Sequence, residues 1–323
     1  MRWYFLTRFL LMIPLLLIIS LLAFVLVRVA PGGPFDRDRA PASPEIERAL
    51  KAKFHLDEPV WKQYLRYLGV GWEFNDGKLQ LFQGGLIRGD LGPSLKHRNH
   101  TVNEIIAQGL PVSLAIGALA FCLAMGIGIP LGVYTAVRKG YWDEYAASFF
   151  AFLAVCVPAL VVGPVLAMLF AIELKWFPVA LWGSPLHAIL PTITLGLFFA
   201  GRISRLMREG MLNTLPAPYI LMARAKGLSE AAVLWRHAFP NAVLPVVSYS
   251  GPLLADLLTG SFVVETIFQL PGIGVLMVNS SLNKDYTLAV GLVLLYAVLL
   301  LVLNLIVDLA YAWLDPRVRY EER

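Results

Sequence analysis

Charged residues are scarce in this sequence. Asp, Glu, Lys and Arg make up 15% of its 323 positions, whereas a soluble domain carries about 25%. Hydrophobic residues make up 58% and gather in runs long enough to cross a bilayer. The net charge of +5 fits basic loops beside a membrane better than a nucleic-acid-binding surface. The composition therefore predicts an all-α polytopic membrane protein embedded in a lipid bilayer, with no nucleic-acid partner.

Cysteine and catalytic motifs are also nearly absent. Cys122 and Cys156 fall inside apolar runs, so we expect buried hydrophobic side chains rather than a disulfide or metal pair. The five histidines show no metal-ligand spacing, and no G-x-x-x-x-G-K-[ST], G-x-S-x-G or H-E-x-x-H motif is present. We therefore expect no enzyme, no metal and no cofactor in this chain. Any ATP must be bound by another subunit.

Six apolar segments are long enough to span a membrane at about 1.5 Å per residue. They cover residues 9–30, 108–137, 145–174, 187–206, 241–264 and 287–314. Glycine and proline interrupt the fourth segment, but packed membrane helices tolerate both. Gly128 and Gly132 have a spacing that lets helix backbones approach closely, although chance produces the same spacing in a glycine-rich apolar chain.

Basic residues indicate the orientation of these spans, because cytoplasmic loops are enriched in Lys and Arg. With the N-terminus inside, the short outer loops contain only Lys175 and Lys284. The inner segments contain Arg2, Arg8, Arg138, Lys139, Arg202, Arg205, Arg208, Arg224, Lys226, Arg236, Arg317, Arg319 and Arg323. Both termini are therefore predicted to lie in the cytoplasm. The protein itself is predicted to lie in the plasma membrane, which is the inner membrane where the cell has two.

The spans divide the chain into four parts. Residues 1–30 form a first transmembrane helix, which we expect to be retained rather than cleaved as a signal peptide. Residues 31–107 form an extracytoplasmic segment, with helical periodicity between Pro44 and Tyr67 and a hairpin signal at 75–77. Residues 108–314 form a core of five spans, and 315–323 form a cytoplasmic tail.

The inner loop 207–240 is the most informative part of the core. Pro216 and Pro218 can open a short helix, because the first helical turn does not need their missing amide protons. Gly227 can end that helix in a left-handed turn. Ser229 can then cap a second helix that runs to Pro240. The loop is predicted to hold two short helices that meet at a glycine.

Three interpretations of this loop compete. It could be a solvated basic linker, since Arg224 and Lys226 obey the charge rule. A DNA-binding helix-turn-helix is disfavoured, because both ends are tethered within a few residues of the membrane. The third interpretation is a docking helix, in which an apolar stripe of Tyr219, Met222 and Ala223 enters a groove in a cytoplasmic partner.

The loop resembles the coupling loop of importer-type ABC permeases. Ala223, Gly227 and Pro240 match the general family motif Glu-Ala-Ala-x3-Gly-x9-Ile-x-Leu-Pro, whereas Leu221-Met222 replaces Glu-Ala and His237 replaces Ile. Residues 223–227 read Ala-Arg-Ala-Lys-Gly, which is the form of the oligopeptide/dipeptide branch. The resemblance assigns ATPase coupling to Tyr219, Ala223, Arg224, Ala225, Lys226, Gly227, Leu228 and Pro240.

Other stretches resemble the same OppB/DppB-like branch. They are residues 28–35, 89–94 (Gly-Asp-Leu-Gly-Pro-Ser), 111–113 (Pro-Val-Ser), 265–274 and 315–320. The resemblance implies an importer-type permease core, a large extracytoplasmic segment after the first helix, and half of a translocation pathway for oligopeptides. Dipeptide, nickel and other small-solute permeases share much of the pattern. A secondary transporter would show inverted repeats and intramembrane charge pairs, and neither is found.

The resemblance also implies partners. These are a second homologous permease, cytoplasmic ABC ATPase subunits that bind the ATP, and an extracytoplasmic peptide-binding protein that delivers the peptide substrate. Alternating access follows: closure of the ATPase dimer moves the docking helices, and the spans open outward.

The carboxylates Asp256 and Asp308 fall inside predicted spans, where ionised groups are costly. Asp256 lies in the fifth span and either lines the translocation path, where it meets a peptide amine, or makes a buried structural hydrogen bond. Asp308 lies near the inner end of the last span, where we expect it to cap a helix or pair with a basic loop residue.

The orientation can be tested by cysteine labelling from outside intact cells. Single cysteines at Ser43 and Asn99 are expected to react with a membrane-impermeant maleimide, because both positions lie in the outer segment. Cysteines at Ser229 and Arg319 are expected to react only after the membrane is permeabilised. Labelling of the Ser229 position in intact cells would overturn both the orientation and the docking interpretation.

Overall fold

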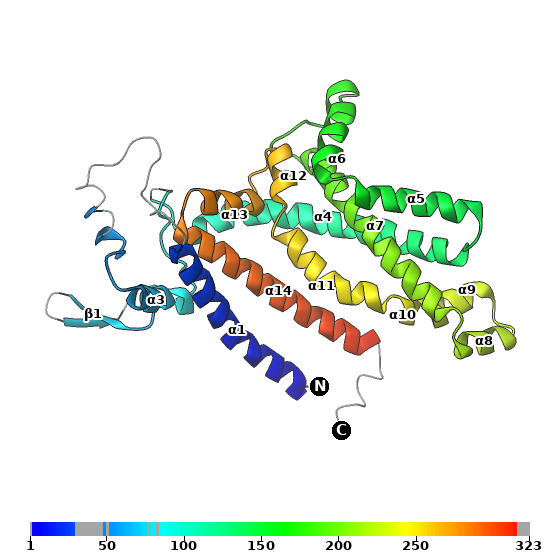
Figure 1. Ribbon diagram of the computed structural model, residues 1–323, viewed down its shortest axis with the longest axis horizontal. Coiled ribbons are helices and arrows are strands. Elements are labelled where there is room, and N and C mark those ends of the chain that lie inside the picture. The colour runs from blue at the N-terminus through cyan, green and yellow to red at the C-terminus, as the bar shows by residue number, and fades with distance from the viewer. Residues whose placement is uncertain are drawn as a thin grey trace. The chain divides into compact units, whose positions relative to one another are not determined.

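The computed structural model describes residues 2–29, 48–49, 52–75, 78–81, 84–97 and 99–314. Among these residues, five helical segments are long and apolar enough to cross a membrane, and a bent helix pair brings the total to six. The helices of the five are α1 (Arg2–Val29), α4 (Val102–Val137), α7 (Ile189–Thr214), α11 (Leu244–Leu258) with α12 (Phe262–Ile267), and α14 (Tyr286–Leu314) (Figure 1). The all-α fold with six candidate spans agrees with the prediction.

The third expected span, residues 145–174, is bent rather than straight. α5 (Trp142–Cys156) is followed at an angle of 101° by the helix Ala159–Glu173, which comprises α6 (Ala159–Leu166) and the π-helical stretch η2 (Ala167–Glu173). Pro158 explains the break, because a proline disfavours helical geometry in the residue before it. Val157 is accordingly extended, with φ −81° and ψ 119°.

The chain forms two compact units. One contains residues 1–8, 112–271 and 299–323, and is called the core unit here. The other contains residues 9–111 and 272–298, and is called the outer-segment unit. The positions Ser43 and Arg319 and the family-like stretches 31–35 and 315–320 lie outside the described residues.

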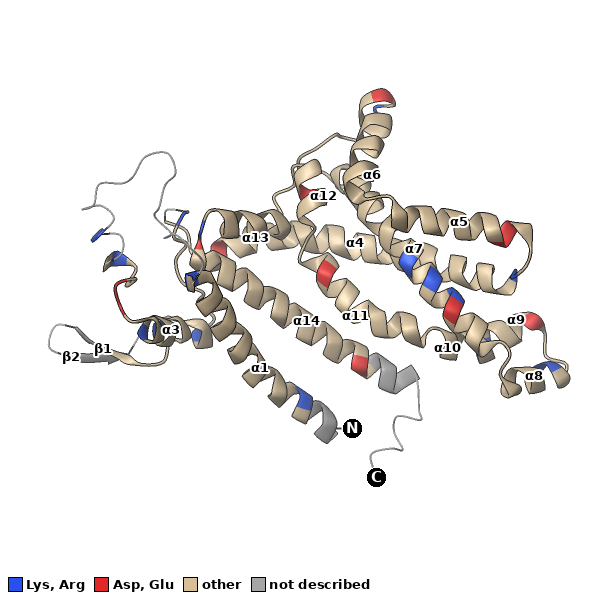
Figure 2. Ribbon diagram, viewed as in Figure 1, with Lys and Arg blue, Asp and Glu red and all other residues tan. Residues whose placement is uncertain are grey.

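Helix α7 is the most widely contacted element of the core unit. It begins after the 3-10 turn η3 (Pro185–Ala188) and packs against α5, α6, α11 and α12. Ile203, Met207 and Met211 of α7 are fully buried within one apolar cluster that includes residues of α4 and α11. Basic residues gather only on its second half (Figure 2). The first half of α7 is thus suited to the apolar layer and the second half to its edge.

The spacing of Gly128 and Gly132 on α4 produces a close helix contact. A Cβ atom on Gly128 would lie 2.7 Å from the carbonyl oxygen of Ala200, and one on Gly132 would lie 2.5 Å from that of Ser204. Both oxygens belong to α7, so the two backbones nearly touch. Because lipid tails are as apolar as core side chains, this close packing replaces the hydrophobic effect as the force between membrane helices.

The outer-segment unit contains α3 (Val60–Leu68), the strands β1 (Trp72–Asn75) and β2 (Lys78–Leu81), the 3-10 turn η1 (Leu86–Arg88) and α13 (Ile273–Leu282). The strands pair antiparallel with Asn75 opposite Lys78, which confirms the expected hairpin, although residues 76–77 lie outside the described chain. Part of the helical region predicted from Pro44 to Tyr67 is present as α3, while residues 44–47 and 50–51 are not described.

Aromatic packing joins α3 to α1 in this unit. The ring of Phe24 lies 5.2 Å from the ring of Tyr64 and 5.6 Å from that of Tyr67. The hydroxyl of Tyr64 is 2.7 Å from that of the buried Ser20. Burial raises the pKa of Tyr67 well above its ordinary value, so this phenol remains neutral. The contacts show why this part of the predicted extracytoplasmic segment is ordered rather than a loose connector.

The two cysteines differ from expectation. Cys122 and Cys156 are free thiols, but both are exposed on the isolated chain. The expectation of burial is therefore wrong. Apolar surroundings in the sequence do not predict burial in a membrane helix, because a side chain can face lipid or another subunit equally well.

A buried carboxylate fastens the start of α14. Asp285 is 1% exposed and accepts hydrogen bonds from the Ser94 hydroxyl and from the backbone N–H of Leu95, the latter at 3.1 Å. It also accepts from the Thr287 hydroxyl at 3.2 Å and from the N–H of Leu288 at 3.3 Å. Asp285 therefore caps α14 and holds the family-like stretch 89–94 against it.

Replacement of Asp285 by Ala is expected to destabilise the protein by about 3 kcal/mol or more, because several buried donors lose their acceptor together. The thermal unfolding midpoint of the purified protein in detergent measures this. Asp57→Ala, which removes an exposed carboxylate from the same unit, is the matched control. Equal midpoints for the two variants would show that the Asp285 contacts are incidental.

Candidate functional site

The loop between α7 and α11 folds into short helices. α8 (Pro218–Ala225) begins with Pro218 after the extended residue Ala217. α9 (Glu230–Ala232), the π-helical stretch η4 (Val233–Ala238) and α10 (Phe239–Ala242) then run almost without interruption toward α11. The structure confirms the predicted geometry of this loop, which is two helical segments joined at a glycine.

Gly227 makes the turn between the two segments. Its φ of +78° is left-handed, and its N–H donates to the carbonyl of Arg224 at 2.9 Å. A Cβ added to Gly227 would meet nothing within 4 Å, so backbone conformation alone requires glycine within this chain. Ser229 caps the second segment by accepting from the N–H of Ala232 at 3.4 Å.

Two polar contacts hold the segments together. The guanidinium of Arg224 donates to both carboxylate oxygens of Glu230, at 2.9 and 3.2 Å, across the Gly227 turn. The side-chain amide of Asn241 donates to the hydroxyl of Tyr219 at 2.8 Å, which joins α10 to α8. The Arg224–Glu230 pair is exposed and contributes little energy, but its two-oxygen geometry restricts the angle at the turn.

The predicted apolar stripe is divided by the fold. Ala223 is 6% exposed and packs with the fully buried Ile220 in the core cluster, so it does not lie on the surface. Tyr219 and Met222 remain 41% and 59% exposed. The docking surface, as we define it, consists of the exposed apolar side chains Tyr219, Leu221, Met222, Leu228 and Trp235.

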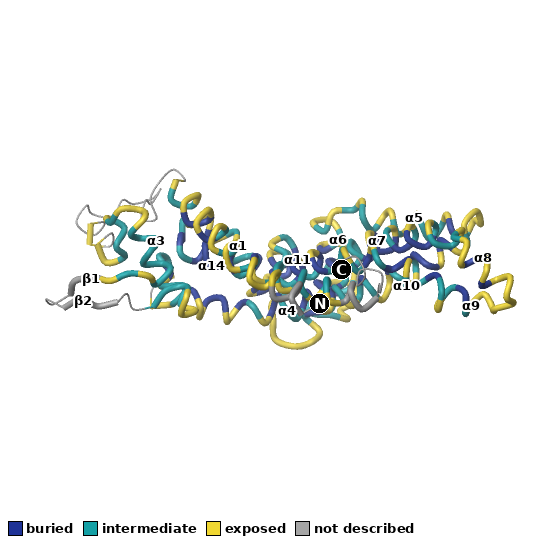
Figure 3. The backbone as a smooth tube through the Cα atoms, turned by 90° about the horizontal axis from the view of Figure 1, so that it is seen from below, coloured by how far each residue is buried: buried dark blue, intermediate teal, exposed yellow. Residues whose placement is uncertain are grey.

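Sequence reasoning missed part of this surface. Leu221 and Trp235 are 54% and 56% exposed, although neither falls on the stripe expected from α8 alone. Trp235 stacks against Phe239 at 5.3 Å within the η4 and α10 segment. Large apolar residues on both sides of the Gly227 turn were the available signal. Most residues of α8 and α9 are exposed, as Figure 3 shows.

The remaining predicted residues lie close by on the same loop. Arg224, Ala225, Lys226 and Leu228 are exposed around the turn, and Pro240 is half-buried in the first turn of α10. The opposite side of the loop is anchored to α7. A Cβ on Gly210 would strike the carbonyl oxygen of Ala242, so α10 and α7 are in direct backbone contact there.

Asp256 is not part of this loop. It lies on α11, about 18 Å along the helix axis from Leu244, where the helix begins. Its neighbours Ala255 and Leu257 are buried, but Asp256 itself is exposed on the isolated chain. Asp256 is therefore not buried within this chain, and both predicted roles, a group on the translocation path and a structural contact, stay predictions. Asp308 forms an ion pair with Arg8, so its partner is basic as expected but lies within the helix α1 rather than in a loop.

Two family-like stretches distant in sequence meet through a buried hydrogen bond. The hydroxyl of Ser113 donates to Oε1 of Glu265 at 2.7 Å, and both residues are at most 2% exposed. Ser113 lies on α4 and Glu265 on α12. The pairing was not predictable from spacing, because the residues are 152 positions apart. Among the described residues, no three His, Cys, Asp or Glu side chains gather as a metal site would require.

A comparison with known families now defines the class of protein. Residues 128–320 match the model of the binding-protein-dependent transport system inner membrane component. The chain belongs to this family of ABC importer permeases. It is a multi-pass inner membrane protein that transports rather than catalyses, and its family works with an ATPase, which handles the ATP, and with a binding protein.

Similarity to individual proteins specifies the branch. The chain is 39% identical to the oligopeptide transport system permease protein OppB of Haemophilus influenzae and 41% identical to that of Salmonella typhimurium, in each case over 95% of this chain and 96% of the relative. It is 38% identical to the dipeptide transport system permease protein DppB of Bacillus subtilis over the full length of both. It is thus an OppB/DppB-like permease.

A solved structure supports the fold. The inward-facing MetNI methionine ABC transporter aligns with a TM-score of 0.55 and 17% identity, over 66% of this chain and 97% of the other. At this identity the likeness concerns the fold alone.

Proposed function

We propose that this chain is the permease subunit of an ATP-driven oligopeptide importer and forms half of the translocation pathway beside a second, homologous permease. An extracytoplasmic binding protein delivers the peptide, and both termini of the chain lie in the cytoplasm. The names of the OppB and DppB relatives support peptides as the substrate class. Loop 207–240 couples the permease to the ATPase.

The single observation that carries the coupling role is the two-sided character of the loop. One side, including Ile220, Ala223 and Val233, is buried in the core cluster. The other side exposes the docking surface. Large apolar side chains that remain exposed on an ordered element are typical of a protein interface. A solvated linker would need neither the buried side chains nor the exposed apolar ones.

The way in which the loop is anchored supports transmission of motion. The Arg224–Glu230 pair, the Ser229 cap and the Asn241–Tyr219 hydrogen bond restrict its internal bending. Its buried side contacts α7, the helix against which most of the core unit packs. A displacement of the docking surface by a partner ATPase therefore moves α7 with it, whereas a flexible loop would absorb the push.

The structure permits a test that separates docking from folding. Met222→Asp is expected to leave the permease folded but to reduce co-purification of tagged ATPase by about tenfold, because a charge on the docking surface must be desolvated. Peptide uptake should fall with it. Ala223→Asp should instead lower permease abundance, because the charge enters the core.

Arg236→Ala is the control for this experiment, since it alters an exposed residue of the same loop outside the docking surface and changes stability by about 0.5 kcal/mol or less. Uptake of a labelled oligopeptide and a labelled dipeptide, measured in the same cells, tests the substrate class. Normal uptake and ATPase association in Met222→Asp would show that the loop is only a basic linker.

Asp256 is proposed as a group on the translocation path. An exposed carboxylate on an apolar helix is too costly to face lipid, so it faces water or the second permease. A carboxylate at that place can attract the amino terminus of a peptide or a basic side chain. It lies on α11, which is joined to the coupling loop through α10.

The substitution Asp256→Asn is expected to reduce peptide uptake several-fold while leaving the amount of assembled complex unchanged, because it removes the charge and keeps the shape. Uptake and a membrane-fraction blot are measured together. A fall in subunit abundance with normal uptake per subunit would instead assign Asp256 to a structural contact between subunits.

A further inference from the structure

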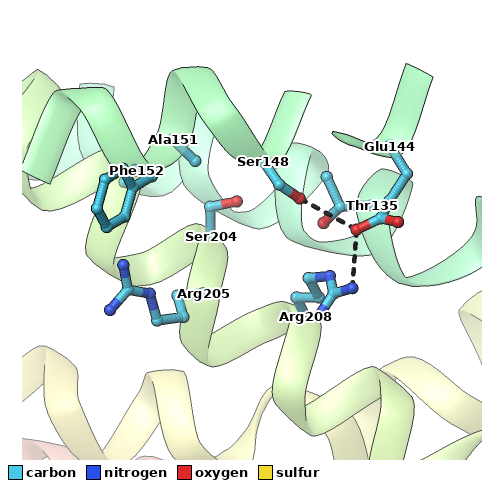
Figure 4. A pocket seen from close by; sticks show the side chains of 9 residues that line it. Thr135, Glu144, Ser148, Ala151, Phe152, Ser204, Arg205 and Arg208 are labelled. Atoms are coloured by element: carbon cyan, nitrogen blue, oxygen red, sulfur yellow. Dashed lines mark hydrogen bonds and ion pairs between the residues drawn. The ribbon is translucent and has the colours of Figure 1, made fainter. Parts of the chain in front are cut away.

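A cavity of about 300 Å³ lies between α5 and α7 of the core unit. Three hydroxyl groups and three charged side chains line it, as Figure 4 shows: Thr135, Ser148, Ser204, Glu144, Arg205 and Arg208. Peptide transport, as proposed above, assigns no task to this cavity. The polar lining of this cavity therefore needs a separate explanation.

A buried ion pair forms one end of the cavity. Glu144 is 4% exposed and accepts from Arg208 Nη2 at 2.8 Å and from the hydroxyl of Ser148 at 3.2 Å. This pair neutralises the charge of Glu144. The Nε of Arg208, however, is buried and has no hydrogen-bond partner among the residues that the structure describes. A buried donor without an acceptor costs about 1–3 kcal/mol, so the position is suited to a ligand oxygen.

Arg205 lies beside the same cavity, one turn before Arg208 on α7. It is exposed and makes no hydrogen bond or ion pair with the described residues. Two guanidinium groups and one carboxylate leave the cavity with one net positive charge. Hydroxyl donors and a single positive charge together match a phosphodiester, which carries one negative charge and several acceptor oxygens.

The surroundings of the cavity are those of the membrane interface. Glu144 is the third residue of α5, and Phe152 lies about 12 Å further along the helix, so the cavity occupies the first turns of the span. The exposed side of α5 is aromatic, with Trp142, Tyr145 and Phe149 at 80%, 67% and 60% exposure. Aromatic residues concentrate where headgroups meet acyl chains.

We propose that this cavity binds the phosphodiester headgroup of an anionic phospholipid, with Arg205 and the Nε of Arg208 as its principal donors. The acyl chains then cover the aromatic side of α5. The inference goes beyond peptide transport and depends on the proposed function only for placing this end of the helices in the cytoplasmic leaflet. Basic pockets between membrane helices on that side are suited to such lipids.

The test uses the complete transporter, purified with its partner subunits in neutral detergent and stripped of lipid. Phosphatidylglycerol or phosphatidylcholine with the same acyl chains is then added back. Native mass spectrometry compares how much of each lipid the complex retains. Wild type is expected to retain phosphatidylglycerol preferentially. Arg205→Gln should lower its affinity about fivefold to tenfold through loss of one charged contact. Ser148→Met should lower it similarly by filling the cavity without a change of charge.

Arg202→Gln is the matched control, because it removes the same charge from the exposed surface of the same helix outside the cavity. It should retain the lipid. Equal retention by wild type and Arg205→Gln, or no preference over phosphatidylcholine, would overturn the proposal. If the complex retains inorganic phosphate alone as well as it retains phosphatidylglycerol, the ligand is a soluble phosphate and the lipid proposal is overturned. Displacement by the transported peptide would place the cavity on the substrate path instead, which also overturns the proposal.

Co-purification of the ATPase is measured on the same samples. A preparation that keeps its ATPase but does not retain the lipid refutes the lipid site and leaves the transport function intact.

Discussion

The core unit depends on the close packing of α7 against its neighbours. At Gly128 and Gly132 the backbone of α4 reaches the carbonyl oxygens of Ala200 and Ser204 on α7. At Gly210 the backbone of α7 reaches the carbonyl oxygen of Ala242 on α10. Membrane helices gain little from hydrophobic burial against each other, so such contacts supply the dispersion energy that holds them. A side chain at any of these glycines would push α7 away from its neighbours.

This packing supports the coupling role proposed for loop 207–240. The loop is anchored to α7 through α10 and through the buried Ile220 and Ala223, while the docking surface points away from the core cluster. A partner that moves the docking surface therefore acts on a helix that is already packed on several sides. Interfaces between packed helices shift between discrete arrangements rather than deforming continuously, as alternating access requires.

Buried polar pairs give each unit its register. Ser113 with Glu265, and Ser94 with Asp285, each satisfy a carboxylate that would otherwise be costly in an apolar environment. Each pair joins segments more than 150 residues apart. Because an unsatisfied carboxylate is so unfavourable, these contacts select one arrangement of helices among several with similar apolar packing. Ser94, Ser113 and Glu265 lie in stretches that resemble the family, and these contacts give those stretches a physical reason.

The sequence by itself determined the number of spans, the inner loop with its Gly227 turn and Ser229 cap, and the absence of recognised catalytic motifs. These follow from local properties, namely apolar length, the conformations open to glycine and proline, and residue spacing. Only the tertiary structure decided that Ala223 is buried while Met222 is exposed, that Cys122 faces outward, and that Ser113 meets Glu265. In a membrane helix every face can be apolar, so periodicity does not identify which face packs inward, and the contacts between distant helices decide it.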